Sequence, residues 1–107
     1  MTIVTTQAIE GRKIKRYCGI VSGEAVVPGN ILKDALANVT DVVGGRSAAF
    51  GAPIQKAKEA AMKDMVDVAL AAQASAVLNV RLDSKVVGGV LMVCATGTAV
   101  LMEGELH

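Results

Sequence analysis

The chain has 107 residues and a formal net charge of +1, with 11 lysines and arginines against 10 aspartates and glutamates. This length predicts a single domain, residues 1–107. The balanced charge provides no basic field for nucleic acid, and two aromatic residues, Tyr17 and Phe50, provide no stacking platform for its bases.

Hydrophobic residues make up 52% of the chain and are almost all aliphatic. A core of this kind relies on many small contacts rather than on a few large rings. A chain of this length also has a large surface relative to its volume. Part of the apolar material is therefore expected to face a second copy, and we predict a homo-oligomer.

Neither end of the chain suggests export or membrane insertion. The stretch MTIVTTQAIEG lacks the basic start and the long apolar segment of a secretory signal. The uncharged run at residues 86–102 is shorter than the about 20 apolar residues of a membrane-spanning helix and predicts a buried hairpin. Two cysteines far apart in sequence form no disulfide framework. Together these features predict a cytoplasmic protein without a membrane partner.

Two strands are predicted in the first quarter of the chain. Residues 2–5 are short and β-branched, and residues 13–27 form a longer run of the same kind. Gly19 and Gly23 interrupt the longer run, which indicates bulges or close approach of another backbone. The basic cluster at residues 12–16 is interpreted as a solvated strand edge that discourages aggregation. The alternative is a phosphate-binding patch.

Two helices are predicted to follow these strands. Pro28-Gly29 ends the longer strand, and Asn30 is suited to cap a helix that ends near Val43, with Gly44 as its left-handed C-terminal residue. The second helix has Pro53 in its first turn, where the missing N–H costs nothing. Its apolar face is expected to carry Ile54, Ala57, Ala61, Met65, Val68 and Ala72.

The last third of the chain predicts two paired strands. Apolar and polar residues alternate over residues 76–83, which places three side chains on the buried face of a strand: Leu78, Val80 and Leu82. A turn is predicted at Val87-Gly88-Gly89. The final strand, Val90–Met102, is apolar on both faces, so both are expected to be covered, the second by a neighbouring subunit.

The resulting order of elements is β-α-α-β-β. This order describes an α/β (α+β) two-layer sandwich, in which helices cover one side of a sheet. The chain contains no internal repeat, low-complexity tract or linker.

The two cysteines are the first candidates for chemistry. Cys18 follows Lys15 and Arg16, and neighbouring cations favour the thiolate that a metal ligand or nucleophile requires. Burial as a small hydrophobe is the alternative for Cys18 and the favoured interpretation of Cys94. A structural zinc site needs about four Cys or His ligands, but the only histidine is the terminal His107. A closed site within one chain is therefore not expected, although a ring of copies can gather several Cys18 or Glu24 side chains.

No catalytic constellation is visible in the sequence. The terminal histidine gives neither cysteine an imidazole partner, so a triad has no support. Three carboxylates, Glu24, Asp34 and Asp41, can meet in space, but nothing in the sequence sets their separation.

The segment Gly44-Gly45-Arg46-Ser47 supports two interpretations. Glycines let backbone N–H groups converge on an anion, and Arg46 can add a bidentate donor. The segment lacks the lysine of a phosphate-binding P-loop. It is also suited to be a joint, in which Gly44 ends one helix and Ser47 caps the next, and this interpretation is favoured.

Four segments at matching spacing give the chain its resemblance to the YbjQ-like family, which is labelled as a heavy-metal-binding domain. They are YCGIVSGEAV (17–26), DVVGGRS (41–47), ASAVLNVRLD (74–83) and GTAV (97–100).

The resemblance implies a β-α-β-β subunit with an antiparallel sheet, like a dodecin subunit, assembled as a ring and expected to be a homopentamer. It also implies that the short N-terminal strand helps to join subunits. Carried over residue by residue, it makes Cys18 and Glu24 the metal-binding candidates for a soft divalent or monovalent ion. Gly44, Gly45, Arg46 and Ser47 are the matching residues of the second segment.

The chain departs from the family pattern at two places. Relatives commonly have Gly-Ala-Asp-Ala before the second long strand, where this chain has Gln73-Ala74-Ser75-Ala76. An acidic group is therefore absent, which weakens the metal hypothesis if that carboxylate helps to hold a cation. Pro53 also lies where relatives continue a helix that starts nearer Ser47.

Three hypotheses follow. The first is a cytoplasmic, ring-forming protein that binds a heavy-metal ion. The second is a protein that binds a small anionic ligand at residues 44–47, and the third is a ring-forming scaffold without a small ligand. No residue set identifies an enzyme reaction.

Overall fold

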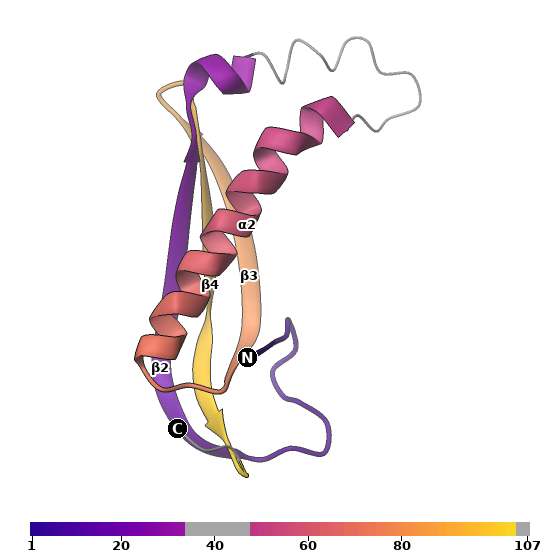
Figure 1. The fold of residues 1–107 in the computed structure, drawn as a ribbon, viewed down its shortest axis with the longest axis vertical. Helices are drawn as coiled ribbons and strands as arrows, with labels where there is room; N and C mark the ends of the chain where they lie inside the picture. Colours follow the sequence, from indigo (N-terminus) through magenta and orange to yellow (C-terminus); the bar gives the residue numbers. More distant parts are fainter. Residues whose placement is uncertain (34–47, 105–107) are drawn as a thin grey trace.

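The computed structural model describes residues 1–33 and 48–104. In these residues a four-stranded sheet, with strand order β1-β3-β4-β2, is covered on one face by the long helix α2 (Figure 1). The elements are β1 (Thr2–Ile3), β2 (Ile14–Val27), α2 (Ala48–Ala71), β3 (Ala76–Val87) and β4 (Val90–Met102). The predicted mixed α+β fold is confirmed.

A two-residue turn joins β3 to β4. Gly88 and Gly89 have φ angles of 59° and 76°, a left-handed pair that glycine adopts without steric cost and that matches the twist of a hairpin. The predicted turn and the predicted bounds of β4 are confirmed. β3 runs to Val87, four residues beyond its predicted end, because its last residues are exposed on both faces and lose the alternating pattern.

The first residues of the chain pair with β3 of the same chain. β1 lies parallel to β3, and Val4 continues the contact, since its N–H donates to Val77 O at 3.0 Å and its carbonyl accepts from Val80 N–H at 3.0 Å. The resemblance assigned this segment a role in joining subunits. In the structure its backbone hydrogen bonds go to its own chain.

β3 contains a bulge, so some of its side chains lie on a different face of the sheet from the one predicted. Asn79 has φ 53°, and the pairing of β3 with β4 shifts between Leu78 and Arg81. The extra residue turns the strand over, so Leu78 and Val80, predicted to share one face, lie in core clusters on opposite faces of the sheet.

The helix α2 rests directly on β2. A Cβ atom added to Gly23 would overlap the backbone of Ala61 and Met65, so only glycine permits this approach. Beside this contact, the Glu24 N–H donates to Asp64 Oδ2 at 3.1 Å. Gly19 has φ 119° and adjoins a bulge in β2. Gly19 therefore adjoins a bulge and Gly23 lies at a close backbone approach, the two roles that were predicted for these glycines.

The start of each helix differs from its prediction. α2 begins at Ala48, so Pro53 lies inside it and removes one backbone hydrogen bond from its early turns. Residues 29–33 are helical, and Pro28 O accepts from Leu32 N–H at 2.9 Å. Asn30 therefore lies within the first turn rather than at the cap. The rest of that predicted helix, to Val43, lies outside the described residues.

The core has one cluster on each face of the sheet. The larger cluster lies between α2 and the sheet and includes Ala57, Ala61 and Met65 of the predicted helix face. Ala69 is buried there in place of the predicted Val68, which is exposed. The smaller cluster lies on the other face, where the N-terminal segment covers the end of β4. Its members are Ala76, Leu78, Val100 and Met102, with Val4, Ile9 and Ile14 packed against them.

The face of the sheet away from α2 is only partly covered. On β4, Met92, Cys94, Thr96 and Thr98 are half-buried or exposed on this face. The cover predicted for it, from a neighbouring subunit, stays a prediction. We call this uncovered region, formed by these four residues and their neighbours on β2 and β3, the open face.

Gln73 ends α2 in a left-handed conformation. Its φ is 63°, its N–H donates to Leu70 O at 3.0 Å, and the N–H of Ala74 donates to Ala69 O at 3.1 Å. These two bonds are the pair that defines a Schellman motif, in which glycine is the preferred residue. The glycine that the resemblance implies for relatives at this position would adopt this conformation without the Cβ penalty.

Replacing Gly23 with alanine is expected to lower the free energy of unfolding by ~1–3 kcal/mol, because α2 must move away from β2 to admit the methyl group. Urea unfolding followed by circular dichroism measures the loss. Ser22→Ala, a change at the exposed neighbouring position, is the matched control and should stay within ~0.5 kcal/mol of the natural sequence. Equal stability of the two variants would contradict the contact.

Replacing Gln73 with glycine is expected to raise the free energy of unfolding by ~1 kcal/mol, since glycine adopts the left-handed conformation without the Cβ penalty. The shift in thermal midpoint measures the gain. Gln73→Ala keeps the penalty and should show no such gain, and a gain in that control would point to another cause.

Candidate functional site

Cys18 lies at a bulge on the helix side of the sheet. Its neighbours Tyr17 and Gly19 pair with consecutive residues of β4, Val100 and Ala99, so Cys18 is the extra residue of β2. Its thiol is free and half-buried, and it packs against the core cluster beneath α2. The basic side chains that precede it, at residues 15 and 16, are exposed.

Glu24 lies on the open face. Its neighbour Ala25 packs against the helix-side core, and successive side chains of a strand alternate between faces. The Glu24 side chain is exposed, while its N–H is held by Asp64. The fold of one chain therefore does not bring Cys18 and Glu24 together.

Cys94 occupies a more polar position than the sequence indicated. It is half-buried on the open face, and β4 pairs it with Glu24 of β2 on one side and with Asp83 of β3 on the other. Residues directly opposite on neighbouring strands share a face, so one thiol lies in a row between two carboxylates. Only the register of the sheet reveals this row, because the three residues are far apart in sequence.

The described part of the chain contains no group of three or more His, Cys, Asp and Glu side chains placed to hold a metal ion. The donors on one chain therefore do not form a closed site among these residues. Residues Gly44, Gly45, Arg46 and Ser47, together with Asp34, Asp41 and His107, lie outside the described residues.

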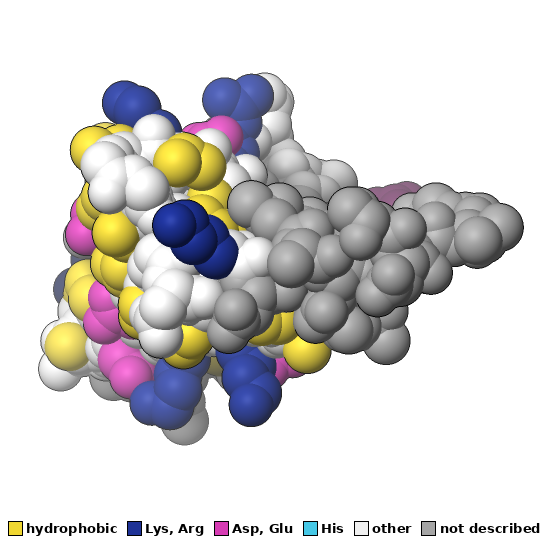
Figure 2. Space-filling view, turned by 90° about the horizontal axis from the view of Figure 1, so that it is seen from above, with side chains coloured by type: hydrophobic (Ala, Val, Ile, Leu, Met, Phe, Trp, Pro, Cys, Tyr) yellow, Lys and Arg dark blue, Asp and Glu magenta, His cyan; other side chains and the backbone are white. Residues whose placement is uncertain are grey.

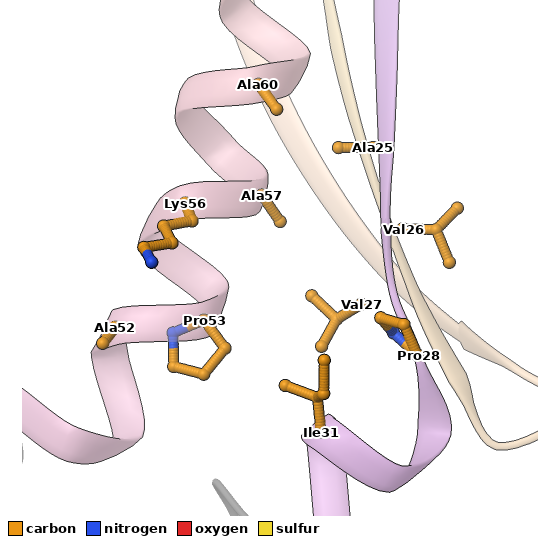
Figure 3. Close-up of a pocket in the computed structure, with 10 residues that line it drawn as sticks. All are labelled: Ala25, Val26, Val27, Pro28, Ile31, Ala52, Pro53, Lys56, Ala57 and Ala60. Carbon is orange, nitrogen blue, oxygen red and sulfur yellow. The ribbon is translucent and has the colours of Figure 1, made fainter.

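A groove of about 410 Å³ lies between the end of β2 and the first half of α2 (Figure 3). In the close-up, Ala25 and Val27 point toward α2 and Val26 points away from it, as expected for a strand. Among the described residues that line the groove, Lys56 is the only charged one. The other lining residues are Ala25, Val26, Val27, Pro28, Ile31, Ala52, Pro53, Ala57 and Ala60.

In residues 1–33 and 48–104, no helix combines the length and the apolar content that crossing a membrane requires. The uncharged run at residues 86–102 instead supplies the β3–β4 turn and the whole of β4.

The comparison with protein families identifies the chain. The model of the YbjQ-like family, described as "Putative heavy-metal-binding", matches residues 1–103. The chain belongs to this family. The match extends from β1 to the end of β4, so the resemblance carried by four short sequence segments is confirmed over almost the full length.

A solved structure has a similar fold. It is a protein of unknown function from Pediococcus pentosaceus ATCC 25745 that belongs to the DUF74 family. The two chains are 14% identical, the match covers 96% of this chain and 98% of that chain, and the TM-score is 0.58. At this identity the likeness supports the fold of this YbjQ-like protein and no finer property.

Ser75, the residue that the resemblance matches to an aspartate of relatives, has a structural role. Its Oγ accepts from the Met102 N–H at 2.9 Å, and its own N–H donates to Val100 O at 2.9 Å. Its carbonyl accepts from the Thr2 N–H at 3.2 Å. Ser75 therefore joins the starts of β1 and β3 to the end of β4.

Replacing Ser75 with alanine is expected to lower the free energy of unfolding by ~1–3 kcal/mol, because the buried Met102 N–H loses its acceptor. Urea unfolding provides the measurement. Ser84→Ala on the exposed part of β3 should change stability by less than ~0.5 kcal/mol. If both serine variants unfold at the same urea concentration, the bond to Met102 contributes nothing.

Proposed function

We propose that this YbjQ-like protein is a cytoplasmic homo-oligomer, a ring and expected pentamer, that binds a heavy-metal ion. The observation that carries the proposal is the family match over residues 1–103, to a family described by heavy-metal binding. Cys18 and Glu24 are the proposed ligands, and soft thiolate donors favour ions such as Cu⁺ and Zn²⁺.

The distribution of donors favours a site shared between copies. Cys18 and Glu24 project from opposite faces of one sheet, and no described group of three donors lies within the chain. Zinc in a closed site is held by about four ligands. A ring resolves this shortage, because each copy presents the same residue to a common axis or interface.

The shape and surface of the chain also favour an oligomer. The radius of gyration is 16.7 Å, whereas a compact domain of this length has about 13 Å. Large apolar side chains are exposed, among them Ile20 at 87% on β2. Seen from the end that carries the β3–β4 turn, apolar side chains reach the surface between lysines and arginines (Figure 2).

Cys94 is a second thiol to consider for the same ion. It shares the open face with Glu24, to which it is paired, while Cys18 lies on the helix side. A ligand set that includes Glu24 therefore has Cys94 as its nearest thiol within the chain. Single substitutions show which of the two cysteines is the ligand, because metal uptake is expected to fall only when the ligand itself is replaced.

Titration under anaerobic conditions with Zn²⁺, Cu⁺ and Ni²⁺, followed by native mass spectrometry, tests the proposal. Uptake of a defined number of ions per assembly is expected. Cys18→Ser should reduce affinity by at least the ~10-fold that loss of a residue supporting a ligand costs. Cys94→Ser tests the second candidate thiol in the same way.

The pattern of loss assigns the ligands. Uptake unchanged by Cys18→Ser but lost with Cys94→Ser would replace Cys18 by Cys94 as the ligand. No uptake by the natural protein at micromolar metal would overturn the metal proposal and leave the scaffold hypothesis.

A further inference from the structure

Met92 and Cys94 bring two sulfur atoms to the open face. Both lie on β4, two residues apart, and the strand pairing is unbroken here, so their side chains project from the same face. Their Cα atoms are about 7 Å apart along the strand. Two sulfurs bound to one ion lie within about 5 Å of each other, since a metal–sulfur bond is about 2.3 Å long. The flexible methionine side chain can span the difference.

Both sulfurs are open to a ligand. Cys94 is a free, half-buried thiol that donates weakly to Ala95 O, with a distance of 3.9 Å between sulfur and oxygen. This bond uses the proton of the thiol and leaves the lone pairs of the sulfur free. Met92 is 38% exposed on the face away from α2. An ion from solvent therefore reaches the two side chains without any opening of the fold.

The number and the kind of donors select the ion. Zinc in a closed site takes about four ligands, and the described residues contain no group of three or more His, Cys, Asp and Glu side chains placed for one ion. Cu⁺ has a filled d shell, prefers soft sulfur ligands and is satisfied by as few as about two of them. A thioether is such a ligand, whereas zinc is held by thiolate, imidazole and carboxylate groups.

We propose that Met92 and Cys94 form a Cu⁺ site within one chain, in which the thioether distinguishes Cu⁺ from Zn²⁺. The inference deepens the metal-binding part of the proposed function and rests on it, but it requires neither a second copy nor Cys18. Binding replaces the proton of the Cys94 thiol, which passes to solvent, and leaves a neutral pair of thiolate and Cu⁺. The copper ion keeps its oxidation state throughout.

The charges on either side of the thiol favour a cation. Glu24 of β2 and Asp83 of β3 pair with Cys94 and share its face, so two carboxylates flank the sulfur. Lys85 pairs with Met92, which places its ammonium group beside the neutral thioether rather than beside the thiol. The carboxylates raise the local concentration of cations, while the soft sulfurs hold the ion.

The test uses the Cys18→Ser variant, in which Cys94 is the remaining thiol. Anaerobic titration with Cu⁺ against a colorimetric Cu⁺ chelator measures the affinity, and native mass spectrometry counts the ions. One Cu⁺ per chain is expected. Adding Met92→Leu should lower the Cu⁺ affinity at least ~10-fold and leave the Zn²⁺ affinity unchanged. X-ray absorption should show two sulfur neighbours of copper before this substitution and one after it.

Two further variants control for the position of the thioether. Met62→Leu replaces a methionine of α2 that packs against the core on the other side of the sheet, and it should leave the Cu⁺ affinity unchanged. Thr96 is the second neighbour of Cys94 on the open face, two residues further along β4. Adding Thr96→Met to Met92→Leu should therefore restore the Cu⁺ affinity. Circular dichroism should show every variant folded.

Three results would overturn the site. They are a Cu⁺ affinity unchanged by Met92→Leu, a Cu⁺ affinity that falls together with the Zn²⁺ affinity, and Cu⁺ uptake that survives Cys94→Ser in the Cys18→Ser background. In each case, metal uptake by the natural protein that depends on Cys18 leaves the proposed function standing. A natural protein that takes up none of Zn²⁺, Cu⁺ and Ni²⁺ would overturn both.

Discussion

The contact between α2 and Gly23 of β2 is the constraint on which the rest of the structure depends. The helix backbone lies against the strand at Ala61 and Met65, so only a glycine fits on β2 at this point. The contact also holds α2 over one edge of the sheet, where Asp64 reaches the Glu24 N–H. A single helix cannot cover both edges of a four-stranded sheet. The position of one glycine therefore decides which edge has a groove and which strand stays exposed.

The features that sequence predicted well are local ones. Glycines at positions 88 and 89 determine a turn by their own backbone freedom, and the helix face from Ala57 to Met65 follows from helical spacing. The faces of β3 were predicted wrongly because Asn79 introduces a bulge without the glycine that usually signals one. Pro53 similarly marks a position inside α2 rather than its start, since the turns before it form despite the missing N–H.

The candidate site was predictable in its residue types but not in its arrangement. Cys18 was identified from its basic neighbours, yet its position beneath α2 depends on a bulge that only strand pairing shows. Cys94 looked like a core residue because its strand is apolar throughout, and its place between Glu24 and Asp83 follows from the register of three strands. Pairing between distant segments is a tertiary property, so a pattern read along one segment does not contain it.

The tight β3–β4 turn also affects the order in which the chain can fold. It brings together strands that adjoin in sequence, so this hairpin closes a loop of two residues and forms on a microsecond timescale. Pairing β2 with β4 instead joins Ile14 to Met102 and encloses most of the chain. Contacts of such long range carry a larger loop-closure entropy and form late. The edge that bears Glu24, Cys18 and the groove is thus expected to be completed after the β3–β4 hairpin, and during synthesis it waits for β4.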